Sequence, residues 1–141
     1  MTFVSNCTED TVNIGLRLGK SISSGGVIAF YGDLGAGKTH FVSGLAKGLG
    51  FTGETYSPTF SLINEYIGGR VPLYHFDMYR VTGWEDLYST GFFDYLDMGG
   101  LLAVEWSENI EAALPQNTIR ITITVIDEIS RKIEIEGVDE I

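Results

Sequence analysis

Residues 32–39, with the sequence GDLGAGKT, combine glycines, a lysine and a threonine in a pattern that suits phosphate binding. The spacing Gly32-x4-Gly37-Lys38-Thr39 is that of the phosphate-binding loop, in which glycines let backbone N–H groups turn inward around a polyphosphate. The lysine of such a loop reaches the outer phosphates, and the hydroxyl that follows it binds Mg²⁺. These residues therefore predict a nucleotide site.

The loop lies between a segment expected to form a strand and one expected to form a helix, as a phosphate-binding loop requires. Residues 25–31 (GGVIAFY) are a short apolar run after two glycines, which is typical of a buried strand. In residues 39–50, Phe41, Val42 and Leu45 fall on one helical face, and the segment ends in glycines. An ordinary glycine-rich turn before a helix is the alternative, and the full motif in this context favours nucleotide binding.

A magnesium ion at such a loop needs an acidic partner, which usually follows a neighbouring apolar strand. Glu105 follows the apolar residues LLAV, and Asp77 follows LYHF. Either carboxylate also suits the polar end of a strand, but a metal expected at the loop favours a functional role. We assign Glu105 to Mg²⁺ and leave three roles open for Asp77: positioning the attacking water, accepting its proton or sharing the metal.

A further candidate lies in residues 57–61 (SPTFS), between the loop and Asp77. Pro58 favours extended geometry at Ser57, and the hydroxyl of Thr59 is placed to sense a γ-phosphate and Mg²⁺ as switch segments do. A turn at the start of a strand, with hydroxyls facing solvent, explains the same residues equally well. The residues alone leave both interpretations open.

Length and composition limit the classes of protein to which the chain can belong. Its 141 residues, 44% of them hydrophobic, fit one domain over residues 1–141 with a substantial core. With one cysteine, no secretory signal and no apolar run long enough for a membrane span, we expect a cytoplasmic protein without membrane contact. The net charge of −10 disfavours nucleic-acid binding by the chain alone.

The remaining hydrophobic patterns predict an α/β fold. Residues 8–22 have apolar residues at helical spacing, with Thr8 as the expected N-cap. A β-hairpin is expected around Gly68 and Gly69. The other expected elements are short helices within 84–96 and at 107–114, a strand at 101–106, and an antiparallel pair at 119–125 and 131–136. We predict a three-layer fold like that of P-loop NTPases, whose mixed sheet has parallel core strands, antiparallel hairpins and helices on both faces.

Four motifs taken together resemble one family. GDLGAGKT, SPTF, YHFDMYR and LAVEW occur in this order, in a chain of this length, as in the TsaE family, the ATPases of bacterial tRNA threonylcarbamoyladenosine synthesis. The resemblance extends over residues 8–136. The loop alone is shared by many families, whereas the four motifs together are specific.

The resemblance implies an ATP- and Mg²⁺-dependent ATPase that is slow without its partners. Those partners would be TsaD and TsaB type subunits, which place a threonylcarbamoyl group on adenosine 37 of tRNA. The small ATPase does not perform this transfer itself and would meet tRNA only indirectly. The net charge of −10 agrees with a chain that binds a partner protein and does not bind tRNA by itself.

The resemblance also implies roles for residues around the metal. It makes Thr39 and Glu105 the Mg²⁺ ligands. Asp77 would be a catalytic acid, in a catalytic set that also includes Lys38 and Glu105. Trp106 would lie beside the metal site.

For the nucleotide, the resemblance implies a phosphate cradle and a place for the base. The cradle would consist of Lys38 and the backbone of Gly32, Asp33, Leu34, Gly35, Ala36, Gly37 and Thr39. Thr59 would lie in a switch-like loop. Adenine would lie against the amino-terminal helix and the carboxy-terminal strands, which indicates Thr11 and either Arg131 or Lys132.

Two histidines and three aromatic residues are interpreted as structural. His40 stands where many members of the family have a second hydroxyl residue, and we expect it to point along the helix and away from the phosphates. His75 lies between Tyr74 and Phe76 in a predicted strand and is treated in the same way. We expect core packing for Phe92, Phe93 and Tyr95, and a docking patch formed by these aromatic side chains is the alternative.

Two other classes of protein share the loop and were weighed against the ATPase. A small-molecule kinase would use the same P-loop and Mg²⁺ site but needs a cationic lid, and the arginines at 17, 70, 80, 120 and 131 include no clustered pair. A GTPase-like switch would need residues that read guanine, and the sequence has no Asn-Lys-x-Asp run. The kinase is therefore the main alternative.

Overall fold

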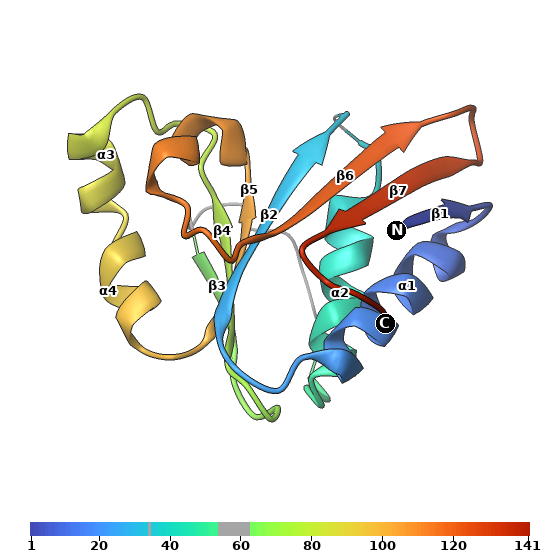
Figure 1. Ribbon diagram of the computed structural model, residues 1–141, viewed down its shortest axis with the longest axis horizontal. Helices are drawn as coiled ribbons and strands as arrows, with labels where there is room; N and C mark the ends of the chain where they lie inside the picture. The colour runs from blue at the N-terminus through green and yellow to red at the C-terminus, as the bar shows by residue number, and fades with distance from the viewer. Residues whose placement is uncertain (34, 54–62) are drawn as a thin grey trace.

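The computed structural model describes residues 1–33, 35–53 and 63–141 (Figure 1). Within this part of the chain, a seven-stranded sheet has the strand order β1-β7-β6-β2-β5-β4-β3. The strands are β1 (Thr2–Ser5), β2 (Gly26–Gly32), β3 (Ile63–Tyr66), β4 (Leu73–Asp77), β5 (Leu101–Glu105), β6 (Ile119–Val125) and β7 (Arg131–Glu136). The chain thus has the mixed α/β architecture that its hydrophobic pattern predicted.

Strand pairing is parallel at the centre of the sheet and antiparallel at both margins. β2 pairs in parallel with β5 and β6, and β4 pairs in parallel with β5. The pairs β1–β7, β6–β7 and β3–β4 are antiparallel. The central strands are continuous apolar runs because both of their faces are covered, whereas β7 alternates between buried and exposed residues.

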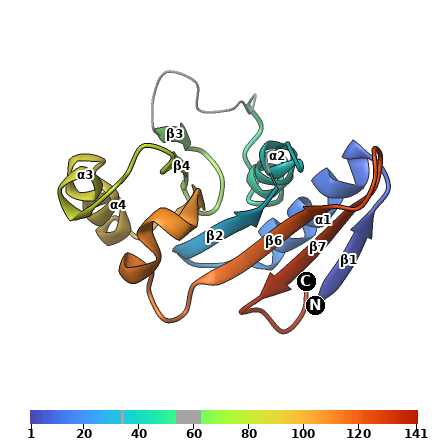
Figure 2. The same ribbon diagram turned by 90° about the horizontal axis from the view of Figure 1, so that it is seen from above.

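Helices cover both faces of the sheet, as predicted (Figure 2). α1 (Thr8–Ser21) and α2 (Lys38–Gly48) lie on one face, and α3 (Trp84–Ser89), α4 (Phe92–Asp97) and the 3-10 helix η1 (Ser107–Ala113) lie on the other. The core therefore has two parts, and adjacent residues of one strand, such as Val27 and Ile28, belong to opposite parts. None of the described helices is long and apolar enough to cross a membrane.

Glycines bring the backbones of α1 and α2 into close contact. A Cβ added to Gly44 would lie 1.9 Å from the carbonyl oxygen of Val12, well inside van der Waals contact. Gly15, Gly19 and Gly48 face backbone atoms of the opposite helix at similarly short distances. The position of α2, and with it the loop that precedes this helix, is therefore set by α1.

The start of the chain differs from the prediction in two ways. Thr8 does not cap α1, because the N-cap is Cys7 in an extended conformation (φ −162°) and Thr8 is the first helical residue. Asp10, in the first turn of α1, accepts a hydrogen bond from the backbone N–H of Asn6 at 2.9 Å. An acidic side chain of the first turn thus ties the helix to the segment that precedes it. Residues Thr2–Ser5, for which no element was predicted, form β1 because β7 supplies its pairing partner.

The predicted elements between β3 and β6 are confirmed. β3 and β4 form the expected hairpin, with Gly68 at a positive φ of 121°. The expected short helix after β5 is a 3-10 helix with a kink at Ile110, and it ends before Pro115. Phe92 is fully buried in α4, and Phe93 and Tyr95 pack against the same cluster, which confirms their structural interpretation.

Candidate functional site

The candidate phosphate-binding loop joins the end of β2 to the start of α2. Gly32, Gly35 and Gly37 have positive φ angles of 112°, 71° and 103°, a region that residues with a Cβ rarely adopt. A Cβ at position 32 would also lie 2.0 Å from the carbonyl oxygen of Ile123. Gly37, which has no side chain that could cap a helix, is the N-cap of α2. No side chain of the N-cap residue thus competes for this helix end, and the start of a helix is a favourable place for an anion.

Hydrogen bonds hold both ends of this loop. Nζ of Lys38 donates to the carbonyl oxygen of Gly32 at 3.1 Å, so the lysine side chain lies back across the loop. The carboxylate of Asp33 accepts a hydrogen bond from the backbone N–H of Val125 at 2.9 Å. The Asp33 side chain is thus directed toward β6, and the backbone N–H of Asp33 also donates to β6, to the carbonyl oxygen of Ile123 at 3.1 Å. Leu34 lies outside the described residues.

A cavity of about 240 Å³ lies over the loop and reaches the end of β5. It is lined by Gly35, Ala36, Gly37, Lys38, Thr39, His40, Glu105 and Trp106. Thr39 and Glu105, which are far apart in the sequence, both line this cavity and both offer oxygen ligands of the kind that Mg²⁺ prefers. In the described part of the chain, no group of three or more His, Cys, Asp or Glu side chains surrounds a possible metal position. Phosphate and water would therefore have to complete the coordination of a metal held here.

Asp77 lies beside Glu105 on the adjacent strand. β4 and β5 run parallel, and their register pairs Asp77 with Glu105. Oδ1 of Asp77 accepts a hydrogen bond from the backbone N–H of Tyr79 at 2.9 Å. The two carboxylates predicted from the ends of apolar strands therefore lie next to each other at one edge of the sheet.

One partner of Glu105 was not predicted from the sequence. His75 is fully buried, as expected of a packing residue, but its Nε2 also lies 2.7 Å from Oε2 of Glu105. The signal was present in the alternation of β4, because residues 75 and 77 share a face and parallel pairing aligns that face with Glu105. His40, in contrast, is exposed near the start of α2.

Trp106 directly follows Glu105 and has an unusual backbone conformation. Its φ and ψ of 59° and 41° lie in the left-handed region, and it is the one non-glycine residue with positive φ in the described part of the chain. Its ring lies edge-on to that of Tyr79, with centroids 5.0 Å apart. Strained backbone of this kind clusters at functional sites. Thr59, the candidate switch residue, lies outside the described residues.

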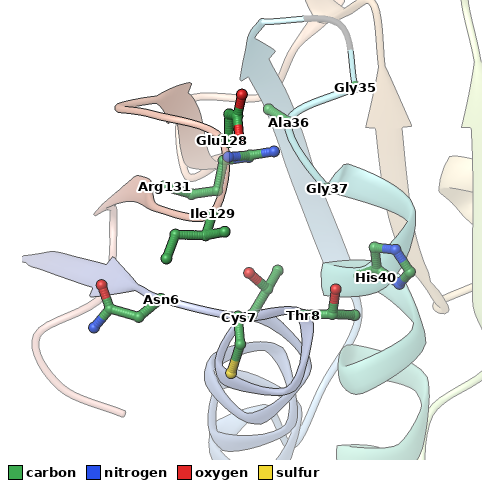
Figure 3. Close-up of a pocket in the computed structure, with 11 residues that line it drawn as sticks. Asn6, Cys7, Thr8, Gly35, Ala36, Gly37, His40, Glu128, Ile129 and Arg131 are labelled. Carbon is green, nitrogen blue, oxygen red and sulfur yellow. The ribbon is translucent and has the colours of Figure 1, made fainter.

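A second cavity, of about 380 Å³, adjoins the first (Figure 3). The two cavities share Gly35, Ala36, Gly37 and His40. The second is also lined by Asn6, Cys7, Thr8, Thr11, Glu128, Ile129 and Arg131. Figure 3 shows that residues of the β6–β7 turn face the loop on one side and the start of α1 on the other.

Two of the three residues predicted near the base line this second cavity. Thr11 is 3% exposed, and its Oγ1 lies 2.7 Å from Oγ of Ser5. Nη1 of Arg131 donates to backbone carbonyl oxygens of the β6–β7 turn at 2.8 and 3.0 Å. Lys132 points to the opposite face of β7, where its Nζ lies 3.1 Å from Oε1 of Glu134. The structure therefore brings Arg131, and not Lys132, to this cavity.

Comparisons with known proteins agree on one family. The family model described as "Threonylcarbamoyl adenosine biosynthesis protein TsaE" matches residues 5–133. A protein of Nostoc sp. (strain PCC 7120), described as "tRNA threonylcarbamoyladenosine biosynthesis protein TsaE", is 47% identical over 131 residues, which cover 90% of this chain and 80% of the relative. A protein of Treponema pallidum with the same description is 38% identical over 135 residues, which cover 96% and 99%.

The fold has a solved counterpart. A crystal structure of YdiB from Bacillus subtilis is similar to this chain with a TM-score of 0.78 and 34% sequence identity. The likeness covers 94% of this chain and 82% of that one.

Proposed function

The chain belongs to the TsaE family, and we propose that it is a P-loop ATPase that binds ATP with Mg²⁺ in support of tRNA threonylcarbamoyladenosine synthesis. Membership of the family supports the role in this tRNA modification. One observation carries the ATPase proposal: Thr39 and Glu105 line one cavity with a loop that contains three glycines of positive φ. Glycines, hydroxyl and carboxylate are the parts from which P-loop sites are built.

The triphosphate would occupy the cavity over the loop. Backbone N–H groups of the loop and of the first turn of α2 would donate to its oxygens, with the positive end of the helix dipole behind them. Lys38 would leave the carbonyl oxygen of Gly32, from which its Nζ is 3.1 Å away, to contact the outer phosphates. In a chain with a net charge of −10, this local group of donors is what would allow a polyanion to bind.

Thr39 and Glu105 would hold Mg²⁺ at the phosphates. A bound Mg²⁺ would neutralise the charge that develops on the transferring phosphoryl group. Asp77, paired in register with Glu105, is placed to position the attacking water, to accept its proton or to share the metal. Trp106 would cover the site on the side next to Glu105.

The adenosine end of the nucleotide would extend into the second cavity. This cavity shares the loop residues with the first, so one ligand can span both. Thr11 lines it from α1 and Arg131 from β7. We therefore assign the base to the space between these two elements and leave Lys132 out of the site.

We propose that TsaD and TsaB type subunits are the partners of the chain and that tRNA is met through them. The net charge of −10 supports this, because affinity for tRNA depends largely on cationic side chains that neutralise phosphates. A slow ATPase that is stimulated on assembly fits a P-loop protein that works together with partner subunits.

Calorimetric titration with ATP tests the nucleotide site. We expect Lys38→Ala to weaken ATP binding at least tenfold, because a hydrogen bond to a charged group contributes about 1.5–3 kcal/mol, and about 1.4 kcal/mol corresponds to a factor of ten. Lys47→Ala is the matched control, since Lys47 is an exposed lysine at the other end of α2. Equal ATP affinity in Lys38→Ala and Lys47→Ala would refute the site.

Co-purification with TsaD and TsaB type subunits, with and without ATP, tests the assembly. We expect association that depends on the nucleotide and phosphate release that increases in the complex. Phosphorylation of a small-molecule acceptor by the chain alone would instead favour the small-molecule kinase.

A further inference from the structure

His75 is a buried polar residue on β4, the strand next to the β3 edge of the sheet, and it contacts the proposed metal site. Its side chain is 0% exposed and lies on β4 between Asn64 of β3 and Ala103 of β5. Burying an imidazole costs free energy unless its nitrogen atoms are hydrogen-bonded. An apolar side chain of similar size would fill the same space at lower cost, so packing alone does not explain a histidine here.

The hydrogen bond that His75 makes goes to Glu105. Nε2 lies 2.7 Å from Oε2 of the carboxylate, a length typical of charge-assisted hydrogen bonds. A carboxylate oxygen accepts hydrogen bonds, so we assign the hydrogen of this bond to Nε2. Nδ1 is buried and has no hydrogen-bond partner among the residues that the structure describes. In the described part of the chain, the ring and this one carboxylate therefore orient each other.

This hydrogen bond fixes the orientation of the Glu105 carboxylate at the cavity. The Glu105 side chain is 18% exposed at a cavity that Thr39 also lines. A glutamate side chain is long and flexible, so its carboxylate is poorly placed for a metal unless a neighbour holds it. With Oε2 engaged by His75, Oε1 is the oxygen that we assign to the metal. Partners that hydrogen-bond metal ligands typically contribute about 10- to 100-fold to metal affinity.

We infer that His75 is a positioning residue that holds Glu105 in the orientation needed to bind Mg²⁺, an inference that rests on the proposed function. His75 acts through Glu105 and does not itself touch the nucleotide. A purely structural histidine would contribute to the stability of the sheet and leave metal affinity unchanged. Metal affinity is therefore the property that separates the two roles.

Three variants distinguish positioning from packing. His75→Phe keeps a planar ring and removes the donor, and His75→Gln keeps an N–H donor near the position of Nε2. Phe76→Leu is the matched control, because Phe76 is the next residue of β4 and equally buried but belongs to the core on the opposite face. For each variant, calorimetry measures the affinity for ATP in EDTA and for Mg²⁺ added to the ATP-loaded protein. Electron paramagnetic resonance with Mn²⁺ gives a second measure of metal binding.

We expect His75→Phe to bind ATP in EDTA as the wild-type protein does and to bind Mg²⁺ about 10- to 100-fold more weakly. His75→Gln should recover most of the metal affinity. Phe76→Leu should lower the melting temperature and leave the metal affinity unchanged. Unchanged metal affinity in His75→Phe, beside normal ATP binding, overturns the inference and leaves the proposed function standing. Failure of the wild-type protein to bind ATP overturns the proposed function and the metal role of His75 with it.

A measurement on the ligand-free protein keeps the inference testable if His75→Phe does not fold. Nitrogen NMR of the His75 imidazole reports which ring nitrogen carries the hydrogen. We expect the hydrogen on Nε2 and a change in the Nε2 signal in Glu105→Gln. A hydrogen on Nδ1 alone would show that Nε2 does not donate to Glu105, and it would overturn the inference.

Discussion

Replacing Gly44 by alanine tests the close packing of α1 against α2, the helix that begins at the loop. Helix propensity and packing predict opposite changes in the free energy of unfolding. Propensity alone predicts that the change stabilises α2 by about 1 kcal/mol. In the folded chain, however, the new Cβ would lie 1.9 Å from the carbonyl oxygen of Val12 and 2.8 Å from its carbonyl carbon. These are backbone atoms, so no change of rotamer relieves the contact.

The expected loss of stability follows from that distance. Cβ atoms essentially never approach another heavy atom within 3.0 Å, so the helices would have to separate by about 1.1 Å from the 1.9 Å contact. Overpacking of this kind costs about 3 kcal/mol, and propensity offsets about 1 kcal/mol, which leaves a net loss of about 2 kcal/mol. With an unfolding entropy of about 2.1 cal/mol/K per residue, a chain of 141 residues should melt about 7 °C lower.

Urea unfolding followed by circular dichroism measures this free energy. Asn13→Ala is the control, because Asn13 is exposed on α1 and alanine there should stabilise the protein by up to about 0.7 kcal/mol. An increase in the free energy of unfolding of Gly44→Ala would refute the close contact between the helices. Folded Gly44→Ala should also bind ATP more weakly, since the second cavity lies between the starts of α1 and α2.

Three further predictions concern the metal, the pH dependence and tRNA. Glu105→Gln should lose Mg²⁺-dependent hydrolysis of ATP and keep binding of ATP in EDTA, and full activity would remove Glu105 from the metal site. Burial, followed by the hydrogen bond and charge of Glu111, raises the pKa of Tyr31 to about 12. Because this pKa is raised on folding, its contribution to stability is present below about pH 10 and is lost toward pH 12. Glu111→Gln should lower the pKa of Tyr31 in an ultraviolet titration, and an unchanged titration would show that Glu111 contributes nothing. With a net charge of −10, the isolated chain should give no gel shift with tRNA at physiological salt, and a submicromolar shift would contradict this.

The loop and its flanking elements could be predicted because their signals are local. The pattern Gly32-x4-Gly37-Lys38-Thr39 states which backbone positions need freedom and which side chains follow them, all within a few residues. The positive φ angles of the glycines and the strand and helix around them agree with that reading. Glu105 was found in the same way, as the first carboxylate after an apolar strand.

The sequence did not predict the N-cap of α1, strand β1 or the choice between residues 131 and 132, because each depends on which partner or which face a residue takes in the fold. Thr8 was a reasonable N-cap, but Cys7 takes that position and Asp10 closes the turn. Four residues of β1 are too few to show a period, and their pairing with β7 joins the two ends of the chain. Residues 131 and 132 both suited the base, and strand alternation assigned only Arg131 to the cavity.

The amino-acid order was thus enough to predict a glycine-rich loop between a strand and a helix, a carboxylate at the end of an apolar strand and the class of fold, because each depends on residue type and short spacing. Folding in three dimensions was needed to place Thr11 at the loop and to join His75 to Glu105. Those contacts depend on the register of β4 with β5 and on the close packing of α1 with α2. Register and helix packing arise from interactions between distant segments, and no short spacing specifies them.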